Sequence, residues 1–303
     1  MSKREFAEEV NTANAFSVRY QISEVLFTGQ SDFQKVEVVQ TKGHCKMLLN
    51  DDLVMITERD EFVYHDMITH VPLFVHPNPK KVLIIGGGDG GTAREVLRHK
   101  GVEHVDMVEI DKMVVDACRE HIPQTAVGMT DSPRFTLYID DGLKFVNDFA
   151  AGKTISQKAS MSPLAQKKYD VVIVDSTDPI GPATPLFGVG FYKDIFACLE
   201  DDGIVVSQGE SPFYNQDTQI SMAKILSSVF PLVKYLNFTN LTYPGGLWSF
   251  SFSSKKYHPV QDFNPARVAA SGLKFKYYTP HLHTAAFNLP QFQLDNIGQY
   301  LQA

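Results

Sequence analysis

A strand that runs into a cluster of glycines and then into a helix is the feature that most constrains this chain. The apolar run Val82–Ile85 is followed by five glycines within six positions, at 86, 87, 88, 90 and 91. Residues Thr92–His99 then carry apolar side chains at helical spacing, and a second apolar strand covers Val105–Ile110. Glycines suit such a loop because its backbone angles are unusual and because a ligand must approach the backbone closely. This order of elements predicts the first half of a doubly wound nucleotide-binding fold.

Glu109 lies at the end of the second predicted strand, 109 − 90 = 19 residues beyond Gly90. A carboxylate at this place can accept hydrogen bonds from the hydroxyl groups of a ribose. A glycine-rich hairpin turn is the competing interpretation of the loop, and the helix and the acid that follow the loop disfavour it. We therefore expect a nucleoside to bind at the glycine loop.

Composition and charge exclude several classes of protein. Of the 303 residues, 44% are hydrophobic and 21% are charged, which is typical of a globular protein in water. No segment approaches the roughly 18 uninterrupted apolar residues of a membrane span, and the first ten residues lack the apolar stretch of a signal peptide. The formal charge of −7 disfavours nucleic acid as a partner. Three cysteines without a metal-binding pair, of which Cys118 and Cys198 fall on apolar helix faces, indicate a reducing cytoplasm.

The pattern of the chain predicts two domains. Residues 1–56 are expected to form a small antiparallel β-sheet domain, although residues 1–20 alone give no firm prediction. Residues 57–303 alternate strands with helices, which predicts a Rossmann-like, methyltransferase-type, doubly wound α/β sheet, mainly parallel with an antiparallel pair at one edge. A gatekeeping helix is expected over 57–71, with Thr57 as N-cap, Asp60 as its capping partner and an end before Pro72. Residues 150–168 contain few large apolar side chains and predict a surface insertion.

The carboxyl ends of the predicted strands are acidic, and ligands of such sheets bind at that edge. The loops there contribute Asp89, Glu109, Asp141, Asp175 and Asp178. Asp89 would repel the pyrophosphate of a dinucleotide. A sulfonium nucleoside of the S-adenosylmethionine type fits better, with Glu109 on the ribose, Asp141 on the adenine amino group and Asp89 on an amine. Because Asp89 also disfavours the α-carboxylate of the ordinary cofactor, the sequence favours its decarboxylated form.

Asp175 and Asp178 share one loop and predict a site for a cationic amine. A primary ammonium has a pKa of about 10 and becomes a nucleophile only when a proton is removed. One carboxylate beside the attacking nitrogen, helped by a tyrosine hydroxyl, would remove that proton, and a second carboxylate would hold the other end of a diamine. The alternative is an Asp-Pro turn in which Asp178 caps the next helix.

Several motifs together resemble the spermidine synthase family of aminopropyltransferases. They fall between about Gln30 and Pro290 and read TERDEFVYHDM (57–67), VLIIGGGDGG (82–91), VEID (108–111), DDG (140–142), VDSTDPIGPA (174–183), QGE (208–210), TYPGGLW (242–248) and HTAAFNLP (283–290). The family transfers an aminopropyl group from decarboxylated S-adenosylmethionine to putrescine and releases spermidine and methylthioadenosine. The resemblance implies this reaction, with the decarboxylated compound as co-substrate, with neither metal nor prosthetic group, and in a homodimer or homotetramer.

The resemblance also implies a role for individual residues, motif by motif. The attacking amine is expected at Tyr64 and Asp175, which hold and deprotonate it. The distal end of the diamine is expected at Asp178, Gln208 and Tyr243. The donor is expected to contact a larger set, with the ribose at Gln34 and Glu109, the adenine at Asp141 and Pro182, the aminopropyl amine at His65 and Asp89, and the backbone at Gly86, Gly88 and Gly142.

The sequence departs from the family in one place that bears on the acceptor. Many members carry a tryptophan near the amino terminus that closes the amine pocket, whereas the only tryptophan here is Trp248. Phe6 and Phe16 are the candidates to replace it. His65 and His283 are too isolated in sequence to predict a metal cluster, and a structural hydrogen bond is favoured for His283.

Alternatives to putrescine transfer remain open at this stage. Cadaverine, agmatine or spermidine could accept the same group. A methyltransferase of the same fold is disfavoured by Asp89 and by the DSTDP loop, and a dehydrogenase is disfavoured by the acid in the phosphate position. An inactive scaffold would be expected to lack Tyr64, Asp175 or Asp178, and all three are present.

Overall fold

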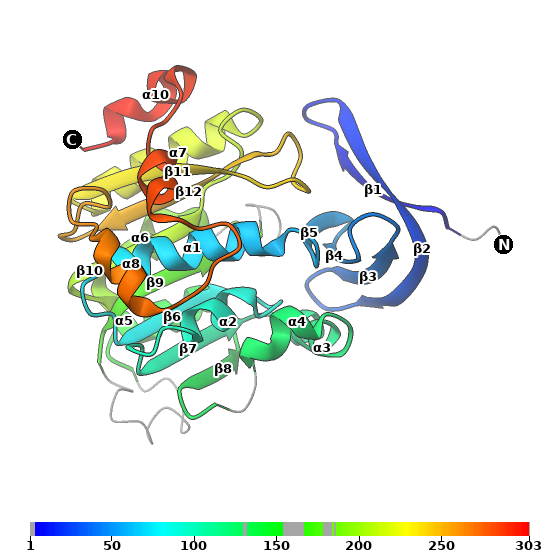
Figure 1. The fold of residues 1–303 in the computed structure, drawn as a ribbon, viewed down its shortest axis with the longest axis horizontal. Helices are drawn as coiled ribbons and strands as arrows, with labels where there is room; N and C mark the ends of the chain where they lie inside the picture. The colour runs from blue at the N-terminus through cyan, green and yellow to red at the C-terminus, as the bar shows by residue number, and fades with distance from the viewer. Residues whose placement is uncertain (1–3, 130–131, 154–166, 178–183, 185, 303) are drawn as a thin grey trace.

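The computed structural model describes residues 4–129, 132–153, 167–177, 184 and 186–302 and contains two β-sheets (Figure 1). The first sheet has five antiparallel strands in the order of the sequence. Its strands are β1 (Phe6–Asn11), β2 (Phe16–Gln30), β3 (Lys35–Thr41), β4 (Lys46–Asn50) and β5 (Leu53–Thr57). The predicted amino-terminal antiparallel sheet is therefore present, and it includes residues before Tyr20, which alone allowed no firm prediction.

The second sheet has seven strands in the order β11-β12-β10-β9-β6-β7-β8. The strands β10, β9, β6, β7 and β8 are parallel, and β12 and β11 complete one edge in antiparallel pairs. The bounds are β6 (Lys81–Gly86), β7 (His104–Glu109), β8 (Phe135–Ile139), β9 (Tyr169–Asp175), β10 (Leu199–Gln208), β11 (Leu232–Thr239) and β12 (Leu247–Ser254). The mainly parallel sheet with an antiparallel edge is thus confirmed.

Helices cover both faces of the large sheet. They are α1 (Glu61–Val75), α2 (Gly91–Leu97), α3 (Lys112–His121), α4 (Pro123–Ala126), α5 (Gly142–Ala150), α6 (Val189–Cys198), α7 (Gln216–Val229), α8 (Pro265–Ser271), α9 (Pro280–Ala286) and α10 (Gln291–Ile297), with short 3-10 turns at Val127–Met129 and Gly298–Tyr300. Alternate residues of β6 pack on opposite faces of the large sheet. Val82 and Ile84 pack with α1 and α2, and Leu83 and Ile85 pack with α5, α6 and α7. This alternation is what a strand buried on both faces requires.

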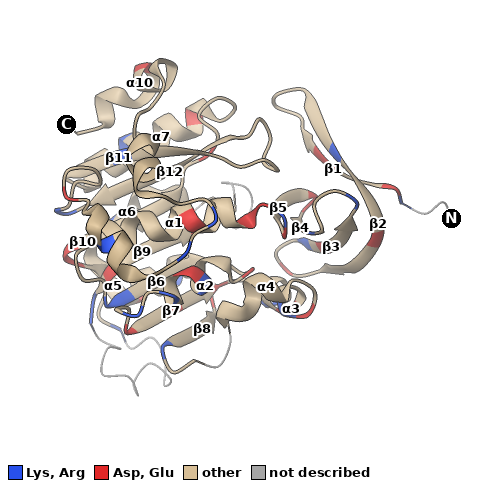
Figure 2. Cartoon of the chain, in the orientation of Figure 1, with Lys and Arg blue, Asp and Glu red and all other residues tan. Residues whose placement is uncertain are grey.

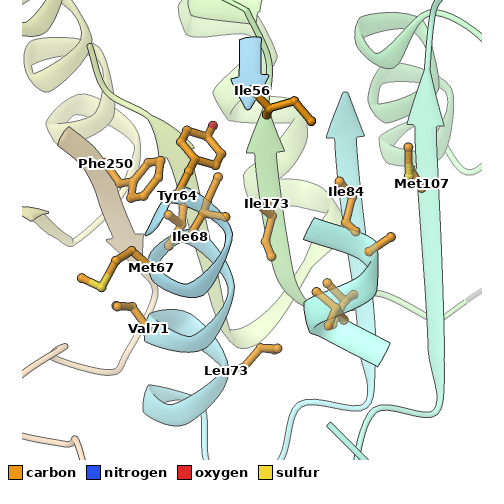
Figure 3. Packing of buried hydrophobic residues seen from close by; sticks show 14 of the residues in the cluster. Ile56, Tyr64, Met67, Ile68, Val71, Leu73, Ile84, Met107, Ile173 and Phe250 are labelled. Atoms are coloured by element: carbon orange, nitrogen blue, oxygen red, sulfur yellow. The ribbon is translucent and has the colours of Figure 1, made fainter. Parts of the chain in front are cut away.

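Helix α1 lies against the sheet beside β12, with Tyr64 next to Phe250 (Figure 3). The prediction for this helix was wrong at both ends. Thr57 still belongs to β5 and donates its hydroxyl to Asp60 Oδ1 at 2.5 Å, while Asp60 is the residue before the helix and does not cap it. Its other oxygen, Oδ2, instead accepts hydrogen bonds from the backbone N–H and the hydroxyl of Thr242. The carboxylate is therefore used in a long-range contact.

The helix also continues through Pro72 to Val75. Proline removes one backbone donor and normally ends a helix. Here the segment is buried on every side, so that all residues from Val63 to Val75 are covered. We attribute the continuation to this packing, which outweighs one missing hydrogen bond.

Four further observations concern the cysteines, the predicted insertion, the charged residues and membrane-spanning helices. Cys118 and Cys198 are buried as predicted. Most of the predicted insertion at 150–168 lies outside the described residues. Acidic and basic residues are interspersed over both parts of the chain (Figure 2). Within the described ranges, we find no helix with the length and apolar character needed to cross a membrane.

Candidate active site

A pocket lies at the carboxyl edge of β6, β7 and β9, where β4, β5 and the start of α1 face the large sheet. Every predicted site residue that the structure describes lines it: Gln34, Tyr64, His65, Gly86, Gly88, Asp89, Glu109, Asp141, Gly142, Asp175, Gln208 and Tyr243. Asp178 and Pro182 lie outside the described residues. Residues separated by up to about 200 positions in the sequence are thus brought to one place, as expected for the carboxyl edge of a doubly wound sheet.

The glycine loop packs directly on the end of β9. Gly86 has a φ of +82°, and a Cβ at this position would lie 2.2 Å from the carbonyl oxygen of Asp175. The next residue, Gly87, donates its backbone N–H to the same oxygen at 2.8 Å. Glycine at 86 is therefore required both by the left-handed backbone and by the close approach of β9. This contact fixes the loop relative to Asp175.

Glu109 is buried at the end of β7 beside the loop. Its Oε1 accepts the backbone N–H of Asp111 at 2.8 Å. Burial, opposed by this hydrogen bond, raises the pKa of Glu109 to about 7. Gln34 reaches the same region from the other sheet and donates its Nε2 to Asp111 Oδ2 at 3.1 Å. The two residues predicted to hold a ribose are therefore held close to each other through Asp111.

Asp141 stands at the start of α5, where its Oδ1 accepts the backbone N–H groups of Leu143 and Lys144 at 2.8 and 3.4 Å. Its neighbour Gly142 is buried, and a Cβ there would lie 2.5 Å from Ile85 Cγ2. The carboxylate is exposed at the pocket. It can accept a further hydrogen bond from a ligand.

Asp175 is surrounded by groups that could serve proton transfer. Thr92 donates its hydroxyl to Asp175 Oδ2 at 2.6 Å. Burial, together with the negative charge of Asp89, raises the pKa of Asp175 above its ordinary value, while hydrogen bonds from Thr92 and Tyr64 oppose that rise. Burial, and after it the charge of Asp175, raises the pKa of the Tyr64 phenol well above its ordinary value, so Tyr64 keeps its proton. The tyrosine can therefore donate, and Asp175 can accept.

His65 and Asp89 face each other beside Asp175. His65 Nε2 lies 3.2 Å from Asp89 Oδ1, and His65 Nδ1 lies 2.6 Å from Glu61 Oε2. The imidazole is fully buried. The sequence did not single out Glu61, which no local pattern distinguishes from an ordinary first-turn acid.

Another part of the pocket wall is formed by Gln208, Tyr243, Trp248 and Glu9. The amide of Gln208 is fixed by Glu210, whose backbone N–H it accepts at 3.0 Å and whose carboxylate it contacts at 3.1 Å. Tyr243 donates its hydroxyl to the carbonyl of Met55 at 2.9 Å, and its ring lies edge to face with Trp248.

The tryptophan of this pocket comes from β12. Trp248 lines the pocket, while neither Phe6 nor Phe16 is among the described residues that do, so the substitution expected from the sequence is wrong. Phe16 packs on Tyr214 instead. Glu9 comes from β1 and accepts the backbone N–H of Val54 at 2.9 Å. No local sequence pattern predicted that Trp248 and Glu9 line the pocket, because their positions depend on how strands that are distant in the sequence pack together.

One cluster in the pocket could hold a cation. The ligand atoms of His65, Asp89 and Asp175 lie within 4.8 Å of one another, as do those of two clusters outside the pocket. Two carboxylates and an imidazole are suited to a divalent metal, but the two carboxylates are equally suited to an ammonium group. The sequence did not predict this cluster, because the two carboxylates are distant from His65 in the sequence and the fold brings them to it. His283 lies elsewhere, with its ring nitrogens 2.8 Å from Tyr278 Oη and the Pro259 carbonyl, as predicted for a structural histidine.

Comparison with known proteins shows the family of the chain. The family model described as the Spermine/spermidine synthase domain matches residues 61–264, and that described as the Spermidine synthase tetramerisation domain matches residues 6–58. The chain belongs to the spermine/spermidine synthase family. It is 45% identical over 280 residues to the polyamine aminopropyltransferase of Alkaliphilus metalliredigens, covering 92% of this chain and 93% of that protein. It is 42% identical over 301 residues to that of Methanocaldococcus jannaschii, covering 98% and 96%.

Solved structures of the family have the same fold. Spermidine synthase from Thermotoga maritima superposes with a TM-score of 0.88 at 36% identity, covering 98% of this chain and 96% of that one. A spermidine synthase in complex with the transition state analogue AdoDATO gives the same TM-score at 37% identity, covering 97% and 95%. The Rossmann-like sheet with an amino-terminal antiparallel sheet is thus the fold of the family, and the match to the tetramerisation domain indicates an oligomer.

Proposed function

We propose that this family member transfers the aminopropyl group of decarboxylated S-adenosylmethionine to putrescine and releases spermidine and methylthioadenosine. The observation that carries the proposal is the position of Asp175, half-buried at the end of β9 between Tyr64, Thr92 and the glycine loop. Family membership supports the coarse activity, aminopropyl transfer in polyamine synthesis. The donor, the acceptor and the residue roles are our proposal.

The nucleoside of the donor is proposed to bind at Gln34, Glu109 and Asp141. Glu109 accepts hydrogen bonds from both ribose hydroxyls, and Asp141 accepts one from the adenine amino group. Pro182, which lies outside the described residues, is proposed to contact the adenine by resemblance to the family. The donor's ammonium binds at Asp89. A carboxylate at that place favours the decarboxylated donor, because the α-carboxylate of the ordinary cofactor would be repelled.

The acceptor is proposed to bind with one amine at Asp175 and Tyr64 and the other near Gln208, Tyr243 and Asp178. The attacking amine arrives as an ammonium and must lose a proton before it can attack. Asp175 takes this proton, and its raised pKa makes the carboxylate a better base than an exposed one. Tyr64 holds the nitrogen. Glu9 lines the same pocket and adds negative charge for a dicationic acceptor.

The chemical step is a direct displacement at the methylene next to sulfur. The lone pair of the amine nitrogen forms the new C–N bond while the C–S bond breaks, and the sulfonium leaves as a neutral thioether. No acid is needed for such a leaving group. Holding the nucleophile and the sulfonium in line converts a bimolecular reaction into one within the complex, which accounts for much of the acceleration.

The test measures methylthioadenosine release from decarboxylated S-adenosylmethionine with putrescine, cadaverine, agmatine or spermidine in separate reactions. Fastest release with putrescine is expected. Faster release with a longer amine would keep the reaction and overturn the acceptor. No release with any amine, together with tight donor binding, would favour an inactive scaffold, and methyl transfer from ordinary S-adenosylmethionine would favour a methyltransferase. Size-exclusion chromatography with light scattering decides between the homodimer and the homotetramer expected for the family.

A further inference from the structure

The imidazole of His65 lies between two carboxylates. Its Nδ1 is 2.6 Å from Glu61 Oε2, and its Nε2 is 3.2 Å from Asp89 Oδ1. The second contact is an ion pair, and within the described residues Nε2 makes no hydrogen bond. A neutral imidazole carries one N–H, and donating it to Glu61 would leave the lone pair of Nε2 facing the negative charge of Asp89. The two carboxylates beside the ring therefore favour the imidazolium.

Glu61 is held in place from its other side by Arg94. The guanidinium makes two parallel contacts to the carboxylate, Nη1 to Oε1 at 3.0 Å and Nη2 to Oε2 at 2.8 Å. Glu61 is 4% exposed, and although burial acts to raise its pKa, hydrogen bonds from His65 and Arg94 lower it to about 2. Arg94 is anchored by Glu95 at 2.9 Å and by the carbonyl of Gln124 at 3.0 Å. The carboxylate facing the ring is thus both ionised and immobile.

Gly91 provides the surface on which the ring lies. A Cβ on Gly91 would be 2.2 Å from His65 Cε1 and 2.4 Å from each ring nitrogen. The backbone of Gly91 has no positive φ that would require glycine, so the ring alone excludes a side chain. The N–H of Gly91 also donates to Asp89 Oδ1 at 2.8 Å. This explains the last glycine of the GGGDGG motif, which the nucleoside site does not need.

These groups form a row of alternating charge that ends in the pocket. Arg94 is positive, Glu61 negative, the His65 ring positive and Asp89 negative. The Gly91 N–H and the His65 ring both lie against Oδ1 of Asp89, so a ligand would be placed at Oδ2. A cation bound there would continue the alternation of charge.

We infer that Glu61 is a positioning residue that keeps His65 an imidazolium and thereby fixes the Asp89 carboxylate where the donor's ammonium binds. This inference rests on the proposed function, because that function supplies the ammonium. Without Glu61 the ring either loses its proton and releases Asp89 or remains as an unbalanced cation that repels the ligand. Both outcomes weaken the binding of an ammonium and spare a ligand that lacks one.

The charge of the ring is measured first, on the ligand-free protein, by the ¹⁵N chemical shifts of the His65 imidazole between pH 6 and 9. The titratable groups that face the ring are Glu61 and Tyr64 on α1, Asp89 in the loop and Asp175 on β9. Burial lowers the pKa of His65, but the charges and hydrogen bonds of Asp89 and Glu61 outweigh burial and raise it well above its ordinary value. We expect both nitrogens to remain protonated at pH 8 in the wild type and the ring to deprotonate at lower pH in Glu61→Gln. A neutral His65 in the wild type at pH 7 would overturn the inference.

The second measurement is the ratio of the dissociation constants of methylthioadenosine, which has no ammonium, and decarboxylated S-adenosylmethionine, which has one. In Glu61→Gln the preference for the ammonium-bearing ligand should fall at least about tenfold, the size of one charge-assisted hydrogen bond. An unchanged ratio with an unchanged His65 titration would overturn the inference. Because the titration uses no ligand, a failure of the proposed reaction is a separate result.

Gly91→Ala gives a second variant in case Glu61→Gln does not fold. Alanine favours a helix more than glycine does, so at the first residue of α2 a purely local effect would be neutral or stabilising. We expect the same loss of ligand preference as in Glu61→Gln, because the ring is displaced. The matched control is Gly190→Ala, at the second residue of α6, where a Cβ meets nothing within 4 Å. Equal ligand preference in both alanine variants would contradict the proposed role of Gly91 in positioning the His65 ring.

Discussion

The proposed contact between Glu109 and the ribose should make nucleoside binding depend on pH. Its pKa in the empty pocket is about 7, chiefly because the side chain is buried. Two ribose hydroxyls can both donate only to the ionised carboxylate, so binding favours the form without the proton. Protonation of the empty pocket then competes with the ligand. Acidification through pH 7 should therefore weaken binding.

The magnitude follows from linkage. A group with a pKa of about 7 is roughly nine-tenths ionised at pH 8 and roughly one-tenth ionised at pH 6. The dissociation constant of methylthioadenosine should therefore be about tenfold higher at pH 6 than at pH 8. Methylthioadenosine is the suitable ligand because it has no ammonium, so its dissociation constant should not depend on the charges of Asp89 and His65. Isothermal titration calorimetry across this range measures the effect.

Two variants assign the dependence to Glu109. Glu109→Gln should bind methylthioadenosine roughly tenfold to hundredfold more weakly and with no dependence on pH between 6 and 8, since a charge-assisted hydrogen bond is lost. Asp175 also has a raised pKa, so Asp175→Asn is the control and should keep the dependence. A wild-type affinity that stays constant from pH 6 to pH 8 would refute the reasoning.

Three further predictions address the loop, the ammonium site and the cation cluster. Asp89→Asn should weaken decarboxylated S-adenosylmethionine at least about tenfold more than methylthioadenosine, measured by calorimetry, and equal losses would contradict the ammonium role. Gly86→Ala should lower the free energy of unfolding by more than the roughly 1–2 kcal/mol of left-handed strain alone, because its Cβ would meet Asp175. Gly152→Ala, also at positive φ but in open space, should show the strain alone in the same denaturant titration. Dialysis against EDTA should leave turnover unchanged, and a loss restored by a divalent metal would assign the cluster of His65, Asp89 and Asp175 to a metal.

The parts of the fold that the sequence predicted are those with a strong local pattern. The run from Lys81 to Glu109 combines a doubly buried strand, a glycine loop and a second buried strand, and β6, α2 and β7 follow that pattern. The acids Asp89, Glu109, Asp141 and Asp175 were expected together because parallel strands end at one edge, and the structure brings all four to one pocket.

The parts that the sequence missed depend on long-range contacts. Strand β2 is an exception, because half-buried or buried apolar and exposed polar residues alternate from Phe16 to Ser23, a local signal that would have predicted a strand. Helix α1 passes Pro72 because it is packed on all sides, which its local sequence does not reveal. Glu61 and Arg94 are 33 residues apart, and their contact exists only because α1 and α2 lie together. Glu9 reaches the pocket through the first hairpin.

The central claim is that Asp175 removes the proton from the attacking amine. Asp175→Asn keeps the shape of the side chain and can still accept from Thr92, so the pocket should still bind methylthioadenosine with wild-type affinity. The measurement is kcat for methylthioadenosine release with saturating decarboxylated S-adenosylmethionine and putrescine. The account predicts a loss of about 10²-fold to 10⁴-fold, the range for a positioned general base. A kcat close to that of the wild type would contradict it.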